Sequence, residues 1–120
     1  MIPTQFEIMK ENMIDIMNEI QEIYKSIDDL VSKSKEHIEL LKTFKNPSYM
    51  NMLIATTANE TLDYLNPILD RIELLDSIYH KMSIKVIKEG GVINIQNNVE
   101  IFNIISNLVD IKLEMKEILR

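Results

Sequence analysis

The sequence predicts an all-α fold: a long antiparallel helical hairpin of coiled-coil type, followed by a C-terminal helix. Apolar residues recur at alternating steps of three and four along most of the chain, which is the spacing of one helix face. Only two glycines and three prolines occur, so the chain has little material for loops or strand turns. Its 120 residues indicate a single helical domain, 1–120.

The first helix is expected to begin at Thr4. Thr4 and Glu7 have the spacing of a capping box, in which each side chain bonds the backbone amide of the other residue. The apolar pattern then continues to Phe44, which gives a helix of about 40 residues, on the order of 60 Å long. Asn46 and Pro47 end this helix and suit the start of the next, because asparagine is a common cap and proline fits the first helical position.

A second Asn-Pro pair, Asn66 and Pro67, raises the question of whether the following helix is interrupted. The apolar stripe passes through this pair without a change of phase, which favours one kinked helix from about residue 47 to residue 82 or beyond. The alternative is two separate helices, over about 47–65 and from about 67 to 82 or beyond.

The segment that follows has two interpretations. Lysines before Gly90 are typical of a helix that ends at a glycine cap. Alternation of apolar and polar residues around the two glycines instead predicts a short β-hairpin over 84–95. We favour a helix that frays into an extended turn and keep the hairpin as the alternative. The last helix is expected to start at Asn97, with Glu100 as its capping-box partner, and to run to the end of the chain.

Charge and composition narrow the possible partners. Thirteen basic against nineteen acidic residues give a net charge of -6, which repels nucleic acid and anionic membranes, so neither is an expected partner. The absence of cysteine excludes disulfides, thiol nucleophiles and thiolate metal sites. No apolar run approaches the ~18 residues of a transmembrane helix, and no signal peptide is recognisable. We expect a cytoplasmic protein, or one inside a host cell if the source is viral, without a cofactor.

A polar interruption occurs in the apolar seam of the first helix at Ser34 and His37. If the second helix folds back near residue 47, Thr57 lies opposite His37. We therefore predict a polar core layer made of Ser34, His37 and Thr57, because polar residues at core positions fix the register of paired helices.

Two pairs of acids suggest an alternative function. Glu36 and Glu39, and then Glu60 and Asp63, are each three residues apart on neighbouring helices, and such carboxylates can hold Mg²⁺. Over residues 36 to 63 this spacing resembles the all-α nucleotide pyrophosphohydrolases of the MazG and dimeric dUTPase type. The resemblance implies magnesium binding by these four acids and attack of water on a phosphate chain. All four are offset from the apolar seams, which instead indicates solvated acids without a catalytic or metal-binding role.

A winged-helix nucleic-acid-binding protein is a further alternative. Helices followed by a glycine-tipped hairpin and a terminal helix match its order of elements, with residues 88–94 as the wing. The helix that would enter the major groove is acidic, and phosphate contacts dominate such binding.

The favoured function is non-enzymatic: an adaptor, structural subunit or inhibitor that acts through helical surfaces. We expect a homodimer or higher oligomer and a further protein partner, because the apolar faces exceed what one slender chain covers. Phe102 and Val109 lie on the far side of the last helix and are candidates to meet a partner. The predicted self-association surface consists of nine apolar residues on the seams of the first and last helices: Phe6, Met9, Met13, Ile16, Ile20, Ile104, Leu108, Ile111 and Met115.

Overall fold

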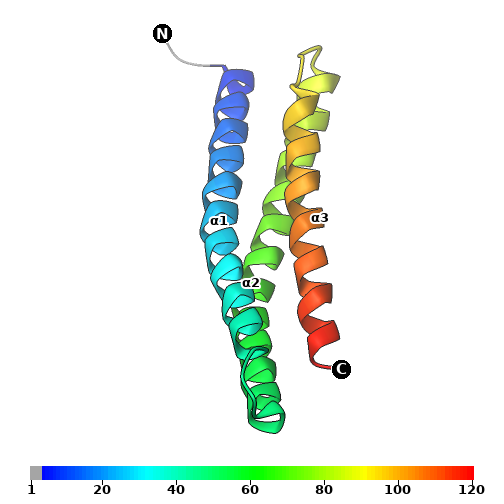
Figure 1. The fold of residues 1–120 in the computed structure, drawn as a ribbon. Coiled ribbons are helices and arrows are strands. Elements are labelled where there is room, and N and C mark those ends of the chain that lie inside the picture. Colours follow the sequence, from blue (N-terminus) through cyan, green and yellow to red (C-terminus); the bar gives the residue numbers. More distant parts are fainter. Residues whose placement is uncertain (1–3) are drawn as a thin grey trace.

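The computed structural model describes residues 4–120, which form three helices and no strand. α1 (Gln5–Leu41) and α2 (Pro47–Lys88) make an antiparallel hairpin, and α3 (Ile95–Ile118) returns along it, parallel to α1 (Figure 1). The principal extents are 68 × 25 × 20 Å, so the molecule is a rod. The all-α prediction, with a long hairpin and a C-terminal helix, is confirmed.

The helix starts follow local backbone chemistry. The Thr4 hydroxyl accepts a hydrogen bond from the Glu7 amide, and the Glu7 carboxylate accepts one from the Thr4 amide, each at 3.1 Å. These bonds satisfy two amides that have no partner inside the helix. At the second start, the side-chain oxygen of Asn46 accepts from the Tyr49 amide at 3.3 Å, and Pro47 is the first helical residue. Both predicted starts are confirmed.

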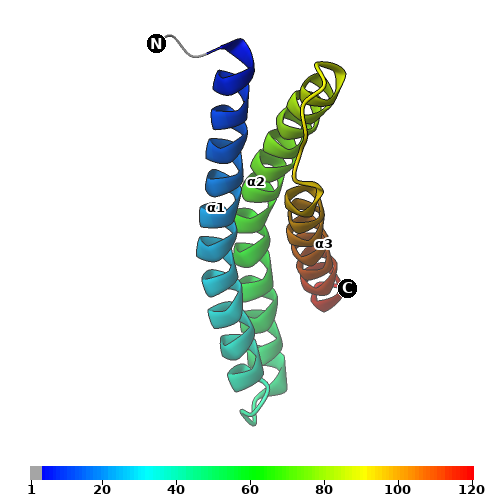
Figure 2. The same cartoon turned by 90° about the horizontal axis from the view of Figure 1, so that it is seen from above.

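α2 continues through Pro67 as a single helix of 42 residues. Proline has no amide hydrogen, so one backbone bond of the helical ladder is missing at this point, which permits a bend. Figure 2 shows the second half of α2 leaning away from α1. The interpretation as one helix is therefore confirmed, and the alternative of two separate helices is wrong.

The turn between α2 and α3 is closed by two glycines. Gly90 has a φ of 81°, and the amides of Gly90 and Gly91 donate to the carbonyls of Ile87 and Val86 at 3.0 and 2.8 Å. This pattern is a Schellman cap, which needs a left-handed residue after the helix. At Gly91 a Cβ atom would collide with the Phe6 ring. The turn therefore packs closely against the start of α1, and any larger residue at position 91 would require Phe6 or Val86 to move.

Two sequence predictions for this region need correction. The β-hairpin alternative over 84–95 is wrong, because α2 remains helical to Lys88 and α3 already begins at Ile95. The predicted cap at Asn97 is also wrong: Asn94 caps the helix by accepting from the Gln96 amide at 3.1 Å. Asn97 instead lies in the first turn, where its side chain donates to the Tyr79 hydroxyl at 3.3 Å.

The core runs along the axis of the rod and receives residues from all three helices. α2 contacts both other helices, whereas α1 and α3 approach each other at fewer places. Three side-chain bonds connect α1 with α3: Gln21 with Glu100 at 2.9 Å, Tyr24 with Asn107 at 3.2 Å, and Lys35 with Glu114 at 2.8 Å. The most deeply buried apolar residues are Ile20, Ile27, Ala58, Leu65, Ile72, Val86, Ile101, Leu108 and Met115.

Candidate functional site

α3 has two apolar stripes on different faces. The first is buried in the core and consists of Ile101, Ile104, Leu108, Ile111 and Met115. The second faces outward at the same spacing and is called here the outer stripe: Ile95, Val99, Phe102, Val109 and Leu113, with Ser106 at the one polar position. At 100° per residue, its centre lies about 160° around the helix from the buried stripe. α3 is therefore apolar on two nearly opposite faces, and its own chain covers one of them.

The outer stripe exposes several large apolar side chains on one face of α3. Phe102 is 68% exposed and Ile95 is 67% exposed, while Leu113 and Val99 are also exposed. Val109 and Ser106 are half-buried, and Val109, at the edge of the stripe nearest the core, packs against the core. Single exposed apolar residues are common on protein surfaces, but a continuous row of them is typical of an interaction site.

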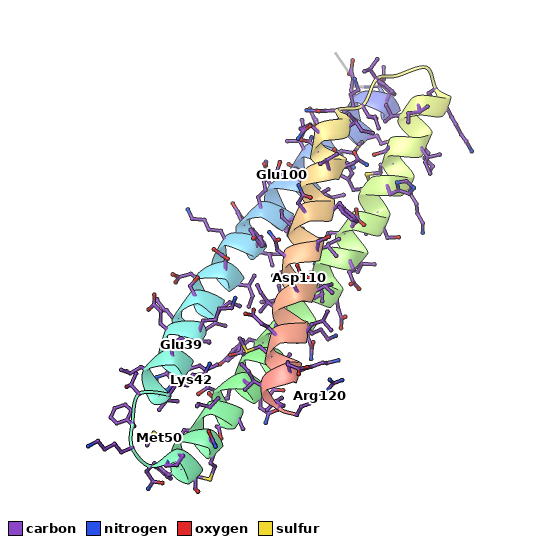
Figure 3. The ribbon with its side chains drawn as sticks, turned by 45° about the vertical axis from the view of Figure 1, so that its right-hand side comes forward. Glu39, Lys42, Met50, Glu100, Asp110 and Arg120 are labelled. Carbon is purple, nitrogen blue, oxygen red and sulfur yellow. The ribbon has the colours of Figure 1, made fainter. Side chains whose placement is uncertain are left out.

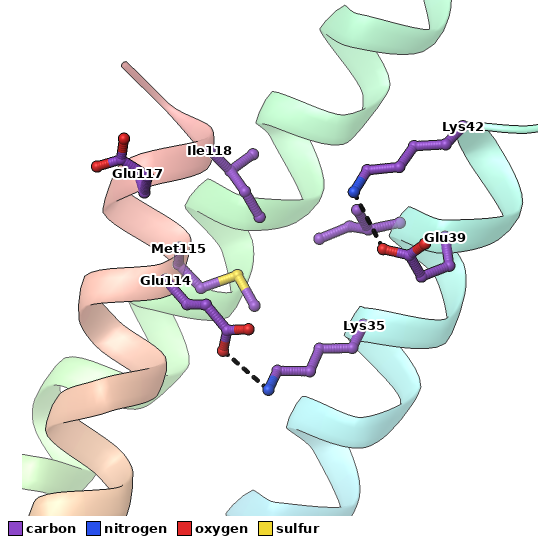
Figure 4. A pocket seen from close by; sticks show the side chains of 8 residues that line it. Lys35, Glu39, Lys42, Glu114, Met115, Glu117 and Ile118 are labelled. Carbon is purple, nitrogen blue, oxygen red and sulfur yellow. Dashed lines mark hydrogen bonds and ion pairs between the residues drawn. The ribbon is translucent and has the colours of Figure 1, made fainter.

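A groove of about 440 Å³ lies where the last turns of α1 and α3 meet (Figure 4). Ile38, Met115 and Ile118 supply its apolar wall. Lys35 pairs with Glu114 across it at 2.8 Å, as the dashed line shows, and the Lys42 ammonium bonds Glu39 within α1 at 3.0 Å. Cations and anions are mixed on the rim, so the groove favours an apolar side chain over a ligand of one charge.

The hairpin extends beyond the end of α3. In Figure 3, Arg120 at the end of α3 lies well short of Met50 near the turn of the hairpin. Beyond this point α1 and α2 have only each other to pack against. Three large side chains of this hairpin tip are more than half exposed: Phe44, Tyr49 and Met52.

The four acids of the predicted magnesium alternative do not gather. Glu36, Glu39, Glu60 and Asp63 are all exposed, and Glu39 is paired with Lys42. Within residues 4–120, no group of three or more acidic or histidine side chains is placed to hold a metal ion. The arrangement lacks the converging carboxylates that a two-helix magnesium site requires.

The predicted polar layer is not formed as expected. His37 is exposed, so its assignment to a core position is wrong, and Ser34 and Thr57 are only half-buried. The Thr57 hydroxyl donates to the Leu53 carbonyl of its own helix at 2.9 Å, and the buried Thr61 hydroxyl donates to the Thr57 carbonyl at 2.8 Å. Threonine satisfies its hydroxyl in this way without a partner from another helix. The threonines of α2 are therefore compatible with an apolar core and need no polar layer.

The predicted self-association surface is mostly occupied by the chain itself. Phe6, Met9 and Ile16 are half-buried and pack against the core. The other six residues are buried inside the three-helix core: Met13, Ile20, Ile104, Leu108, Ile111 and Met115. Their assignment to a self-association surface is wrong in this structure, because α3 folds back and brings the two seams onto α2.

The outer stripe was only partly visible in the sequence, where Phe102 and Val109 stood apart from the main seam. The last helix carries a second apolar repeat on another face, and this repeat joins Ile95, Val99 and Leu113 to the same stripe as Phe102 and Val109. The exposed tip could have been inferred from helix lengths, since a third helix of 24 residues cannot cover one of 42.

Comparison with known protein families, with curated proteins and with solved structures finds no match to this chain. In the part of the chain that the structure describes, the apolar stretches of the helices are too short and too interrupted by charge to cross a membrane.

Proposed function

We propose that this chain is a non-enzymatic helical assembly protein, which associates with itself and works by binding protein. The observation that supports this most directly is the outer stripe of α3, where Phe102 and its neighbours form an uncovered apolar row at helical spacing. Burying such a row against another chain removes apolar area from water, which is the main driving force of association.

The hairpin tip adds to this proposal. Its exposed apolar residues include Phe44 and Tyr49, and aromatic side chains are enriched in the centres of protein interfaces. The tip lies at one end of the rod, away from the outer stripe, so the two surfaces can be occupied at the same time. A chain that joins its own copies through one surface and meets a further protein through the other would act as an adaptor or a structural subunit.

Light scattering after gel filtration tests the proposal. We expect a mass that rises above the 14.0 kDa of one chain as the protein concentration increases from about 1 to 100 µM. A mass that stays at 14.0 kDa over this range would overturn the proposal.

A nucleotide hydrolysis assay tests the enzymatic alternative independently. Because Glu39 and Glu60 are exposed and not gathered, we expect no magnesium-dependent release of pyrophosphate from a panel of nucleoside triphosphates. Release that is abolished by Glu39→Gln or Glu60→Gln would replace the assembly proposal with a hydrolase.

A further inference from the structure

We propose that the outer stripe pairs with the outer stripe of a second copy of this chain, so that the two α3 helices lie parallel across a two-fold axis. The inference rests on the proposed function and adds to it the partner, the surface and the orientation. The residues of α3 and the charges on both sides of the stripe support it.

The outer stripe has the spacing of a coiled coil. Written as a heptad repeat abcdefg, it places Val99, Ser106 and Leu113 at the a positions. The d positions along the stripe are Ile95, Phe102 and Val109, and the next d position, Lys116, lies just beyond its end. Apolar residues at a and d allow two helices to interlock their side chains along a common seam. The small Ser106 leaves room beside Phe102 in the middle of the seam, and its hydroxyl can face its own copy.

The charges beside the stripe select the orientation. On one side, the e positions hold Asp110 and Glu117, and on the other side a g position holds Lys112. In a parallel pair, each g residue meets the e residue five places later on the partner. Lys112 therefore meets Glu117 of the second copy, and the two-fold axis repeats this pair. An antiparallel pair with the stripes aligned would instead place Lys112 near Asn98 and Asp110 near Gln96 of the partner, so the Lys112–Glu117 pair would be lost.

These charged groups are available for the pairing. Within the residues that the structure describes, Lys112 and Asp110 take part in no ion pair. Glu117 contacts Arg120 of its own helix at 3.3 Å, with both side chains more than two thirds exposed. Such a surface pair contributes little and can be exchanged for another.

The position of the stripe on the rod leaves space for the second copy. The stripe lies about 160° around α3 from the buried stripe, so α1 and α2 are on the opposite side of the helix. The seam is about 28 Å long at 1.5 Å per residue. A stable dimer buries about 800 Å² per partner, which is more than a short seam supplies, so we expect a dissociation constant in roughly the micromolar range.

Cysteine crosslinking tests the orientation cleanly, because the chain contains no cysteine. In a parallel dimer residue 99 meets its own copy, so Val99→Cys should form a disulfide-linked dimer under mild oxidation. In an antiparallel dimer with the stripes aligned, residue 99 meets residue 109. A mixture of Val99→Cys with Val109→Cys would then give the mixed dimer, and this result would overturn the proposal. Ser77→Cys, on an exposed part of α2, is the control and should stay monomeric after oxidation.

Two matched leucines test the surface. Leu113, 58% exposed, belongs to the outer stripe, whereas Leu74, 52% exposed, lies on α2. We expect Leu113→Ala to raise the dissociation constant about tenfold or more, and Leu74→Ala to leave it unchanged. The helical circular dichroism of both variants should match the parent chain, because neither side chain is buried. If both variants dimerise like the parent, the assembly proposal stands but the outer stripe is not its surface.

A charge exchange tests the predicted ion pair. Lys112→Glu should weaken the dimer at low salt, and adding Glu117→Lys to the same chain should restore it, because the pair is then re-formed with reversed signs. The mass of each variant is measured by light scattering at about 50 mM and 500 mM salt, where screening should reduce the difference. Lack of restoration in the double variant would overturn the parallel arrangement.

Discussion

The middle of the rod and the hairpin tip are built from the same two helices but differ in burial. Where α3 lies beside the hairpin, Leu65 and Ile72 have no exposed surface. At the tip, Phe44 and Met52 are more than half exposed. The α1–α2 seam itself stays buried there, for example at Leu41, so the two places differ in the apolar residues that lie outside this seam. The periodicity of a helix defines an apolar face, and the number of neighbouring helices decides how much of that face is buried.

The largest expected effect comes from removing a side chain in the middle of the rod. Leu65→Ala should lower the free energy of unfolding by about 3 to 4 kcal/mol, because three helices surround the cavity it leaves. Leu41→Ala, near the tip, should cost only about 2 kcal/mol, because Leu41 is buried next to the hairpin turn, where the structure can close more readily around the space left by the deletion. Urea unfolding followed by circular dichroism gives both values, and equal losses would contradict the comparison.

The second prediction concerns local opening. The first turn of α2, around Met50, lies beyond the end of α3, whereas Tyr79 farther along α2 bonds Asn97 of α3. We expect at least about tenfold lower protection from hydrogen exchange around Met50 than around Tyr79, which corresponds to about 1.4 kcal/mol in opening free energy. Hydrogen exchange read by mass spectrometry on the intact chain measures this difference. Uniform protection along α2 would show that the tip is as stable as the middle.

A smaller effect is expected at the buried threonine between these two regions. The Thr61 hydroxyl bonds only the Thr57 carbonyl of its own helix, and that carbonyl keeps its place in the helical ladder without it. Thr61→Val, which keeps the shape, should therefore change the free energy of unfolding by less than about 1 kcal/mol. A larger loss in urea unfolding would mean that the hydroxyl also has a role across the helices, as the sequence prediction of a polar layer required.

The smallest effect is expected from the ion pair at the boundary with the tip. Lys35 and Glu114 connect α1 with α3 at 2.8 Å, but their side chains are 44% and 58% exposed. Solvent screens such a pair, so Lys35→Ala should cost about 0.5 kcal/mol or less. A double-mutant cycle with Glu114→Ala isolates the interaction. A coupling above about 1 kcal/mol would mean that α3 is fastened by charge as much as by its buried stripe.

Much of the fold was predictable because local rules fix it. The capping box at Thr4, the Asn46 cap and the continuity of α2 through Pro67 each depend on residues within one or two turns. The start of α3 was predicted at the wrong residue because Asn94 and Asn97 are both good caps. The choice between them depends on the conformation of the turn that follows α2. The bond between Asn97 and Tyr79 cannot be predicted from the sequence, because it depends on how α2 packs against α3.

The surfaces were harder to predict, for a physical reason. A heptad pattern shows that Ile20 and Leu108 need an apolar neighbour, but it does not say whether this neighbour belongs to the same chain. In the structure both are buried within one chain, so the seams that suggested self-association are already used. His37 likewise follows the heptad count, yet it lies on the exposed side of α1, while the neighbouring Ile38 takes the buried position.

The 68 Å length of the rod has a consequence for the proposed dimer. A parallel two-fold arrangement of α3 places both hairpin tips at the same end of the particle, pointing in the same direction. A ligand with two copies of a tip-binding motif would then engage both at once, with the second contact made at a high effective concentration. Two weak contacts at Phe44 and Tyr49, one on each copy, would then give a higher overall affinity for such a ligand. Dimerisation through the outer stripe would therefore control the affinity of the hairpin tips for their ligand.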